Sequence, residues 1–101
     1  MQASQFINLE IIILKLLKNN DLSSEQLYQF FEKYFTITEG ELLTSLFFLY
    51  EMDLISINTS QDTMIYHIEE AGCVRYTTLK REYQNIYHSM EDIFQNEKDK
   101  I

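Results

Sequence analysis

The side chains that most often perform catalysis are few and scattered in this chain of 101 residues. It has one cysteine, Cys73, and two well-separated histidines, His67 and His88. A structural zinc ion takes about four such ligands, so the sequence does not predict a metal site. Ser23 and Ser24 stand directly before a helical pattern, where serine is expected as a helix cap and not as a nucleophile. We therefore predict that the protein is not an enzyme and has no cofactor.

Charge is the second chemical feature of the sequence. The net charge is −8, and no lysine or arginine occurs from Tyr34 through Val74. The same window carries seven carboxylates, at Glu39, Glu41, Glu51, Asp53, Asp62, Glu69 and Glu70. Such a region is not attracted to the phosphates of nucleic acid or to anionic lipid.

The most informative stretch is ITEGELLTSLFFLYEMDLI, residues 37 to 55. It contains four acidic residues and no basic residue, and it places Phe47 and Phe48 side by side. An exposed aromatic side chain within a polar rim is typical of a site that binds another protein. Phe47 and Phe48 lie about 100° apart on a helix, so they cannot both face the core. We expect one of them to be exposed, Phe47 in preference. The alternative is that this ring is covered, either by the wing (the β-hairpin predicted below) or by a second copy of the chain in a dimer.

Hydrophobic periodicity predicts three helices before any strand. The first has apolar residues at helical spacing and ends near Asn19–Asp21; these residues are Phe6, Leu9, Ile12, Ile13, Leu16 and Leu17. Ser23 or Ser24 caps the second, whose apolar face is formed by Leu27, Phe30, Phe31 and Tyr34. Thr38 and Glu41 have the spacing of a capping box at the start of the third helix. Leu42, Leu46 and Leu49 of that helix should face the core.

The period changes after Asp53. Two short stretches at residues 54–57 and 64–68 are rich in β-branched and aromatic residues, with a turn-like segment at 58–63 between them, and predict a β-hairpin. A long helix follows from about Glu69 to near Phe94, and residues 95–101 form a charged tail that we expect to be frayed.

The predicted fold is mostly α with a small β-hairpin wing, a winged helix-turn-helix with a long C-terminal helix. We assign residues 1–70 to the winged helix-turn-helix domain and 71–101 to the C-terminal dimerisation helix with its charged tail. The longest apolar run, Ile11–Leu14, is too short to span a bilayer. We expect a cytoplasmic protein without membrane contacts.

The third helix and first wing strand resemble those of PadR-family transcriptional regulators. Seven residues fall in register with that family's pattern, namely Thr38, Gly40, Leu42, Leu46, Leu49, Leu54 and Ile55. The stretch YHIEEAG, residues 66–72, is similar to the family's exit from the wing, and the resemblance covers roughly residues 9 to 94. It implies a role in transcription regulation and a homodimer formed through the C-terminal helix.

The sequence departs from the family where its members contact DNA. The family's paired basic residues become Phe47 and Phe48, and its helix-start tyrosine becomes Leu43. The residues that would face DNA or a partner are Glu41, Leu43, Thr44, Phe47, Phe48 and Glu51 on the helix. Those of the wing are Asn58, Thr59, Ser60, Gln61 and Asp62, which lack the usual cations.

In the C-terminal helix, apolar residues alternate at intervals of three and four. They are Tyr76, Leu79, Tyr83, Ile86, Met90 and Ile93. This spacing is that of a coiled-coil seam and predicts dimerisation. The alternative is that the stripe packs on the first helix of its own chain, and both arrangements are compatible.

These observations favour a dimeric winged-helix regulatory protein that acts through a protein partner, because its reading helix and wing are acidic. One alternative is a direct DNA-binding repressor, with contacts from Lys15, Lys18 and Lys33. Another is a DNA mimic whose carboxylates occupy the nucleic-acid site of a second protein. The aromatic residues also allow a small-molecule pocket at the dimer interface, although such residues more often form the core.

Overall fold

The computed structural model describes residues 9–99, and side chains through residue 96. The described residues form four helices and three strands: α1 (Leu9–Asn19), β1 (Leu22–Ser23), α2 (Ser24–Tyr34), α3 (Glu39–Glu51), β2 (Ile55–Ser60), β3 (Thr63–Ile68) and α4 (Glu70–Asp99). The predicted order of three helices, a hairpin and a long helix is confirmed. Phe6 and the last two residues of the predicted tail lie outside the described residues. The rest of that tail continues α4 to Asp99 instead of fraying after Phe94.

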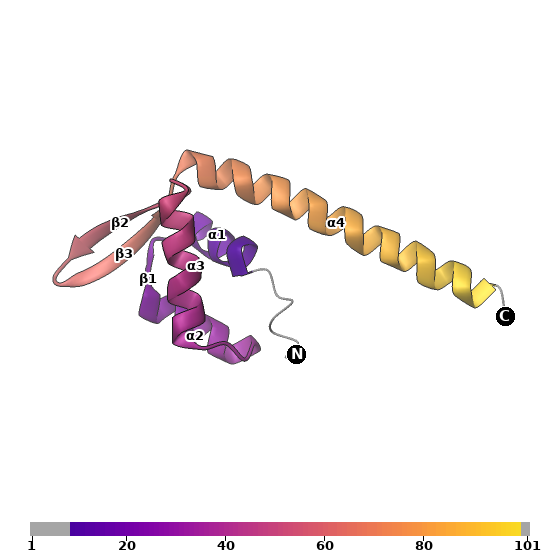
Figure 1. Cartoon of the computed structure of the whole chain (residues 1–101), viewed down its shortest axis with the longest axis horizontal. Helices are drawn as coiled ribbons and strands as arrows, with labels where there is room; N and C mark the ends of the chain where they lie inside the picture. Colours follow the sequence, from indigo (N-terminus) through magenta and orange to yellow (C-terminus); the bar gives the residue numbers. More distant parts are fainter. Residues whose placement is uncertain (1–8, 100–101) are drawn as a thin grey trace.

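The first three helices lie together beside the base of the β-hairpin, while α4 leads away from them (Figure 1). The hairpin projects from the helices on the side opposite to the free end of α4 (Figure 1). This arrangement gives the molecule a longest dimension of 62 Å, against 28 Å and 21 Å in the other two directions. The chain is therefore a winged helix with one long helical arm.

Two capping boxes set where α2 and α3 begin. The Ser23 hydroxyl accepts from the Gln26 backbone N–H at 3.2 Å, and the Gln26 side chain accepts from the Ser23 N–H at 2.9 Å. Thr38 and Glu41 make the same reciprocal pair, at 3.1 and 2.8 Å. Each box satisfies backbone donors that have no partner within the helix. Both boxes were predicted from the sequence and are confirmed.

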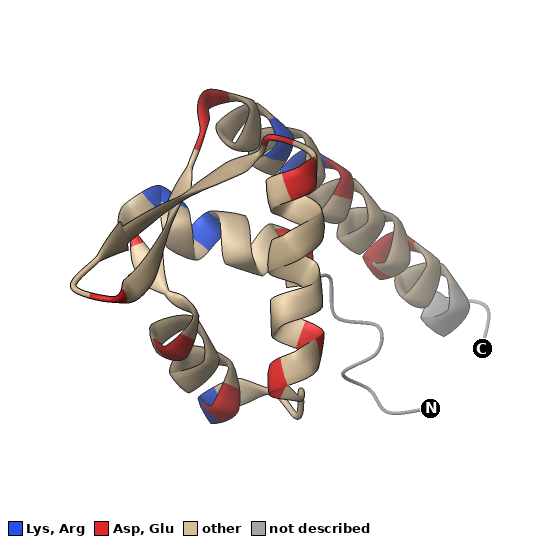
Figure 2. Cartoon of the chain, turned by 60° about the vertical axis from the view of Figure 1, so that its left-hand side comes forward, with Lys and Arg blue, Asp and Glu red and all other residues tan. Residues whose placement is uncertain are grey.

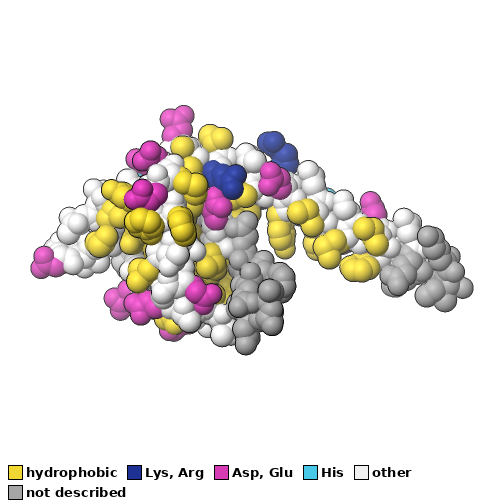
Figure 3. All heavy atoms as spheres, in the orientation of Figure 1, with side chains coloured by type: hydrophobic (Ala, Val, Ile, Leu, Met, Phe, Trp, Pro, Cys, Tyr) yellow, Lys and Arg dark blue, Asp and Glu magenta, His cyan; other side chains and the backbone are white. Residues whose placement is uncertain are grey.

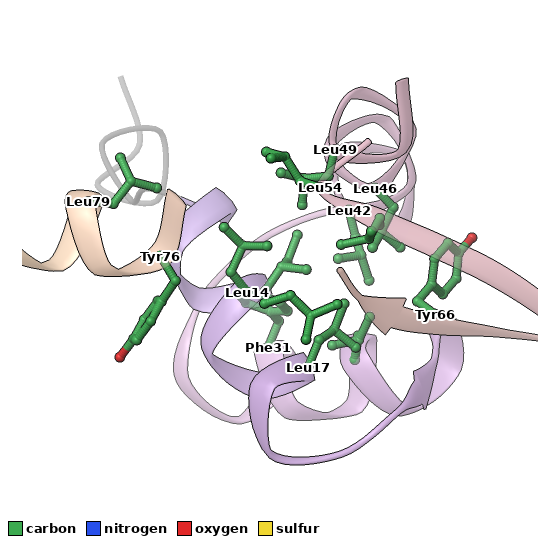
Figure 4. Close-up of a cluster of buried hydrophobic side chains, with 14 of the residues drawn as sticks. Leu14, Leu17, Phe31, Leu42, Leu46, Leu49, Leu54, Tyr66, Tyr76 and Leu79 are labelled. Carbon is green, nitrogen blue, oxygen red and sulfur yellow. The ribbon is translucent and has the colours of Figure 1, made fainter. Parts of the chain in front are cut away.

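The core is formed by one face of each helix and the base of the sheet (Figure 4). Leu42, Leu46 and Leu49 of α3 are all buried there, as predicted from their spacing. They share the core with residues of the other elements, including Ile13, Leu14, Leu17, Leu27, Phe31, Ile55, Tyr66, Tyr76 and Leu79. This packing fixes which flank of α3 faces outward.

The sheet is antiparallel and has the strand order β1-β3-β2. The two-residue strand β1, which pairs Leu22 with Tyr66, was not predicted. The wing also differs from the prediction. Residues 58–60 belong to β2, and only Gln61 and Asp62 form the turn. Their φ angles are 51° and 64°, as a two-residue type I′ turn requires at both central positions.

Candidate protein-binding surface

The outward flank of α3 is apolar. Side chains of five hydrophobic residues of this helix and its C-cap are exposed: Leu43, Phe47, Phe48, Tyr50 and Met52. We call these five residues the α3 surface. Figure 3 shows hydrophobic side chains gathered along α3 with acidic side chains between and around them. The buried leucines occupy the opposite flank, so these side chains have no place in the core.

Phe47 and Phe48 are the centre of the α3 surface. Both are exposed, at 57% and 58% of their maximum area, where the sequence predicted exposure of one. Their ring centroids lie 6.0 Å apart with the rings at 64°. This is an edge-type contact of the kind that aromatic pairs prefer. Within the described part of the single chain, neither the wing nor another helix buries the pair.

Carboxylates surround the α3 surface. Glu39 and Glu41 lie in the first turn of α3 and Glu51 at its end, and the last turn contains no basic residue. In Figure 2 the acidic positions mark both ends of α3 and the tip of the wing, whereas the basic positions lie on α1, α2 and α4. Thr44, on the same helix, is exposed and uncharged. The predicted partner-facing residues of α3 thus share one apolar and acidic face.

The wing adds polar groups but no cation. Asn58, Thr59 and Ser60 are exposed at the end of β2, and Gln61 and Asp62 are exposed in the turn. The exposed Met64 on β3 is an apolar wing residue that the predicted site did not include. Strand alternation alone could have placed Met64 on the same face as Tyr66, which is buried, so only the tertiary structure reveals its exposure.

A small hollow lies at the C-terminal end of α3. It has a volume of about 250 Å³ and is lined by Tyr50, Glu51, Asp53, Ile55, Ser56 and Glu69. The sequence analysis had named Glu69 as part of the acidic region, but it had not linked Ile55 or Ser56 to a surface site. The hollow joins residues from the end of α3, from the start of β2 and from the link between β3 and α4, which the hairpin brings together.

The apolar stripe of α4 divides into two parts. Tyr76 and Leu79 are only 6% and 7% exposed and belong to the core of their own chain, in which α4 contacts α1. Tyr83, Ile86, Met90 and Ile93 are exposed along the arm. The alternative of packing on the chain's own first helix therefore holds for the first part of the stripe. The same face of the arm also exposes Tyr87 and Phe94, which the heptad pattern had not included.

Polar contacts tie the arm and the wing to α1. The Arg75 guanidinium donates to the Glu10 carboxylate at 2.7 and 3.5 Å, linking α4 to α1. His67 Nδ1 donates to the Asp21 carboxylate at 2.8 Å, linking β3 to the loop after α1. The hydrogen bond to Asp21, followed by the charges of Asp21 and Glu69, raises the pKa of His67.

This geometry has close counterparts among solved structures. A PadR family transcription regulator from Clostridium difficile superposes with a TM-score of 0.80 at 17% identity, over 85% of this chain and 97% of that one. The fold is that of a PadR-like winged helix. A Streptococcus mutans protein matches with a TM-score of 0.80 at 21% identity, over 86% of both chains. A transcriptional regulator from Clostridium thermocellum matches at 0.74 with 19% identity, over 83% of this chain and 87% of that one.

Comparisons at the level of sequence add no family assignment. No family model matches the sequence, and no curated protein matches it. The PadR-like resemblance therefore stands on the fold, as the pattern around α3 and the wing predicted. Within residues 9–99, no cluster of three or more histidine, cysteine, aspartate or glutamate side chains is arranged to hold a metal ion. None of the described helices has the length and apolar character needed to cross a membrane.

Proposed function

We propose that this chain is a dimeric winged-helix regulatory protein in which α3 binds another protein instead of DNA. The observation that carries the proposal is the pair Phe47 and Phe48, exposed where a DNA-reading helix would present cations. Direct readout of bases is accompanied by many contacts to phosphates, which side-chain cations largely supply. An aromatic pair with a carboxylate rim instead has the chemistry of a protein-binding hot spot.

The acidic rim argues in the same direction. Between residues 35 and 73 the chain has no lysine or arginine, so α3 and the wing cannot offset the repulsion between their carboxylates and a polyanion. Direct DNA binding is the second candidate function, favoured by the exposed Lys15 and Lys18 of α1 and Lys33 of α2. Those side chains belong to elements other than the helix that would enter the groove.

The proposal is tested by measuring two kinds of binding with the full chain. Fluorescence anisotropy with random duplex DNA at about 0.15 M salt should show no binding. When native lysate treated with nuclease is passed over the immobilised chain, we expect the chain to retain a partner protein. The Phe47→Lys variant should no longer retain it, because a cation replaces the aromatic anchor. The thermal midpoint should barely change, since the ring is exposed.

Val74→Lys is the matched control, because Val74 is an exposed apolar residue of α4 outside the α3 surface. It should retain the same protein as the parent chain. Tight, salt-sensitive binding to duplex DNA would instead favour the repressor. Unfolding of the Phe47→Lys variant would contradict the exposed position on which the proposal rests.

A further inference from the structure

We infer that the α3 surface takes a basic segment of its partner, one in which apolar side chains alternate with lysine or arginine. This inference rests on the proposed function, because it specifies the chemistry of the protein that α3 binds. It is carried by three features that adjoin one another: the exposed aromatic pair, the uncompensated carboxylates around it, and the hollow at the end of α3.

The apolar part of the partner would cover Phe47 and Phe48. The two rings touch, and Leu43 and Tyr50 lie on the flank of α3 next to Phe47, since residues three and four apart are helix neighbours. Burying one aromatic ring of this kind removes a large apolar area from water, and such residues dominate the energetics of protein interfaces. A purely charged segment would leave this area in water.

The carboxylates around the rings are not neutralised by cations from the described part of the chain. Among the residues that the structure describes, Glu51 and Asp53 at the end of α3 form no ion pair, whereas Glu10 is paired with Arg75. Glu69 has only a long contact of 3.7 Å with His67 Nε2. A partner that brings lysine or arginine to this rim would gain attraction over the whole face, while an acidic partner would be repelled.

The hollow gives one of these cations a defined position. Glu51, Asp53 and Glu69 line it, and the C-terminal end of α3 adds the negative end of the helix dipole. Tyr50 supplies an aromatic ring, and aromatic rings attract lysine and arginine through cation–π interaction. Its volume of about 250 Å³ is smaller than the pockets of roughly 300–1,000 Å³ that hold small ligands. It has room for the end of one lysine or arginine side chain.

Charge also excludes the two other natural occupants. A second copy of the chain seated face to face on α3 would bring its own acidic face against this one, and like charges placed opposite each other across an interface oppose binding. Duplex DNA would meet the same repulsion. A basic protein segment is the occupant that satisfies both the rings and the rim.

The test is selection of random peptides, displayed on phage, against the immobilised full chain at about 0.15 M salt. Enriched peptides should combine lysine or arginine with aromatic or aliphatic residues. Synthetic copies of the enriched peptides should bind the Phe47→Ser protein, which lacks the anchor, at least about tenfold more weakly than the parent chain. They should lose as much affinity for the Glu51→Lys protein, in which a charge at the hollow is reversed. Asp92→Lys makes the same change of net charge on the far face of the α4 arm. It should leave the affinity within about twofold.

Three results would overturn the inference. They are enrichment of peptides without cations, equal losses for Glu51→Lys and Asp92→Lys, and no enrichment at all. The first would leave the proposed function standing if Phe47→Ser still abolished binding, because α3 would then bind a protein of different chemistry. Failure of the proposed function has another signature, namely binding of duplex DNA that depends on α3.

Discussion

Gly72 shows how a single residue can fix the junction between the wing and the arm. A Cβ atom at this position would lie 2.2 Å from the backbone oxygen of Leu54 and 2.7 Å from Cγ1 of Ile68. The Leu54 oxygen cannot move freely, because it accepts a hydrogen bond of 2.9 Å from the Glu69 N–H. Only glycine allows α4 to begin this close to the start of β2.

We therefore expect Gly72→Ala to destabilise the protein by about 2–3 kcal/mol, the range of a strongly overpacked site. For a domain of this size that lowers the thermal midpoint by roughly 10 °C or more. Gly40→Ala is the control, since its Cβ would meet only the Thr38 hydroxyl, at 3.9 Å. Gly40 lies in the first turn of α3, and alanine there should be neutral or stabilising by up to about 1 kcal/mol. Thermal unfolding followed by circular dichroism distinguishes the two, and equal midpoints would contradict the close approach.

His67 makes stability depend on pH near neutrality. The pKa of its imidazole is raised, first by the hydrogen bond to Asp21, so the folded state binds the proton more tightly than the unfolded state. The stabilisation is complete below the unfolded pKa of about 6.5 and is lost as the pH rises through the folded value.

The free energy of unfolding should accordingly fall as the pH rises above about 6.5, through the raised pKa of His67. The pair is exposed, so the fall should be small, on the order of 0.2–1 kcal/mol. Urea denaturation at several pH values measures it. His67→Gln and Asp21→Asn should each flatten the profile, while His88→Gln controls for the loss of a histidine as such. A profile unchanged by both of the first two variants would show that the contact has no energetic weight.

At the scale of the elements, α3 ends in a backbone conformation that its sequence does not favour. Asp53 has φ of 60°, in the left-handed region, directly after the C-cap Met52. An L-residue there is strained relative to glycine, and a carboxylate at a helix C-terminus opposes the helix dipole. Asp53→Gly should stabilise the protein by about 0.5–1 kcal/mol.

Asp53→Asn separates the two causes, because it removes the charge and keeps the Cβ atom. We expect the Asp53→Asn variant to be stabilised by only part of the amount that Asp53→Gly gives. Chemical denaturation at low salt, where the helix dipole is least screened, measures the difference. Destabilisation by Asp53→Gly would mean that the Asp53 side chain makes a contact that matters more than the strain.

The elements also show what sequence patterns can and cannot predict here. The helices and both capping boxes were predictable because local spacing and local hydrogen bonds determine them. The strand β1 was not, because two residues carry no periodicity and its pairing with β3 is a tertiary contact. The extent of β2 was missed because Asn58, Thr59 and Ser60 are polar residues typical of turns. In an exposed hairpin such residues extend the strands, since neither face needs to be apolar.

The candidate site was predictable in its composition and not in its geometry. Spacing placed the leucines of α3 inward and predicted exposure of one of Phe47 and Phe48, whereas both are exposed. It treated the stripe of α4 as one seam, although Tyr76 and Leu79 pack in their own core. Whether an apolar residue of α4 packs against its own chain or is left exposed for another depends on where the helix extends beyond the domain. A local sequence pattern does not predict that point. The hollow at the end of α3 likewise joins three segments and has no sequence signature.

At the scale of the whole molecule, the arm formed by α4 is too long to be covered by its own domain. A helix of 30 residues measures about 45 Å, and all of its side chains from Lys80 to Asn96 are exposed. Six large hydrophobic side chains share one face of this exposed part: Tyr83, Ile86, Tyr87, Met90, Ile93 and Phe94. Contiguous exposed apolar faces of this kind usually mark an interface. We propose that a second copy covers it.

Ile86→Asp combined with Ile93→Asp should convert the dimer to a monomer, because carboxylates would be buried at the seam without partners. Leu79 is unsuitable for this test, since it lies in the core. Asn85→Asp with Asn96→Asp adds the same charge on the opposite face of the arm and should leave the dimer intact. Sedimentation of the parent chain and both variants measures the outcome, and a monomeric parent at tens of micromolar would contradict dimerisation.

Salt provides an independent check on the dimer. Each copy carries a net charge of −8, so two copies repel each other while the apolar stripe draws them together. Raising the salt concentration from about 0.05 to 0.5 M screens the repulsion, because the Debye length shortens well below the spacing of most charges. Dimerisation should therefore strengthen with salt, whereas binding of the acidic α3 surface to a basic segment should weaken. A dimer that dissociates as salt is added would indicate that ion pairs, and not the apolar face of α4, hold the two copies together.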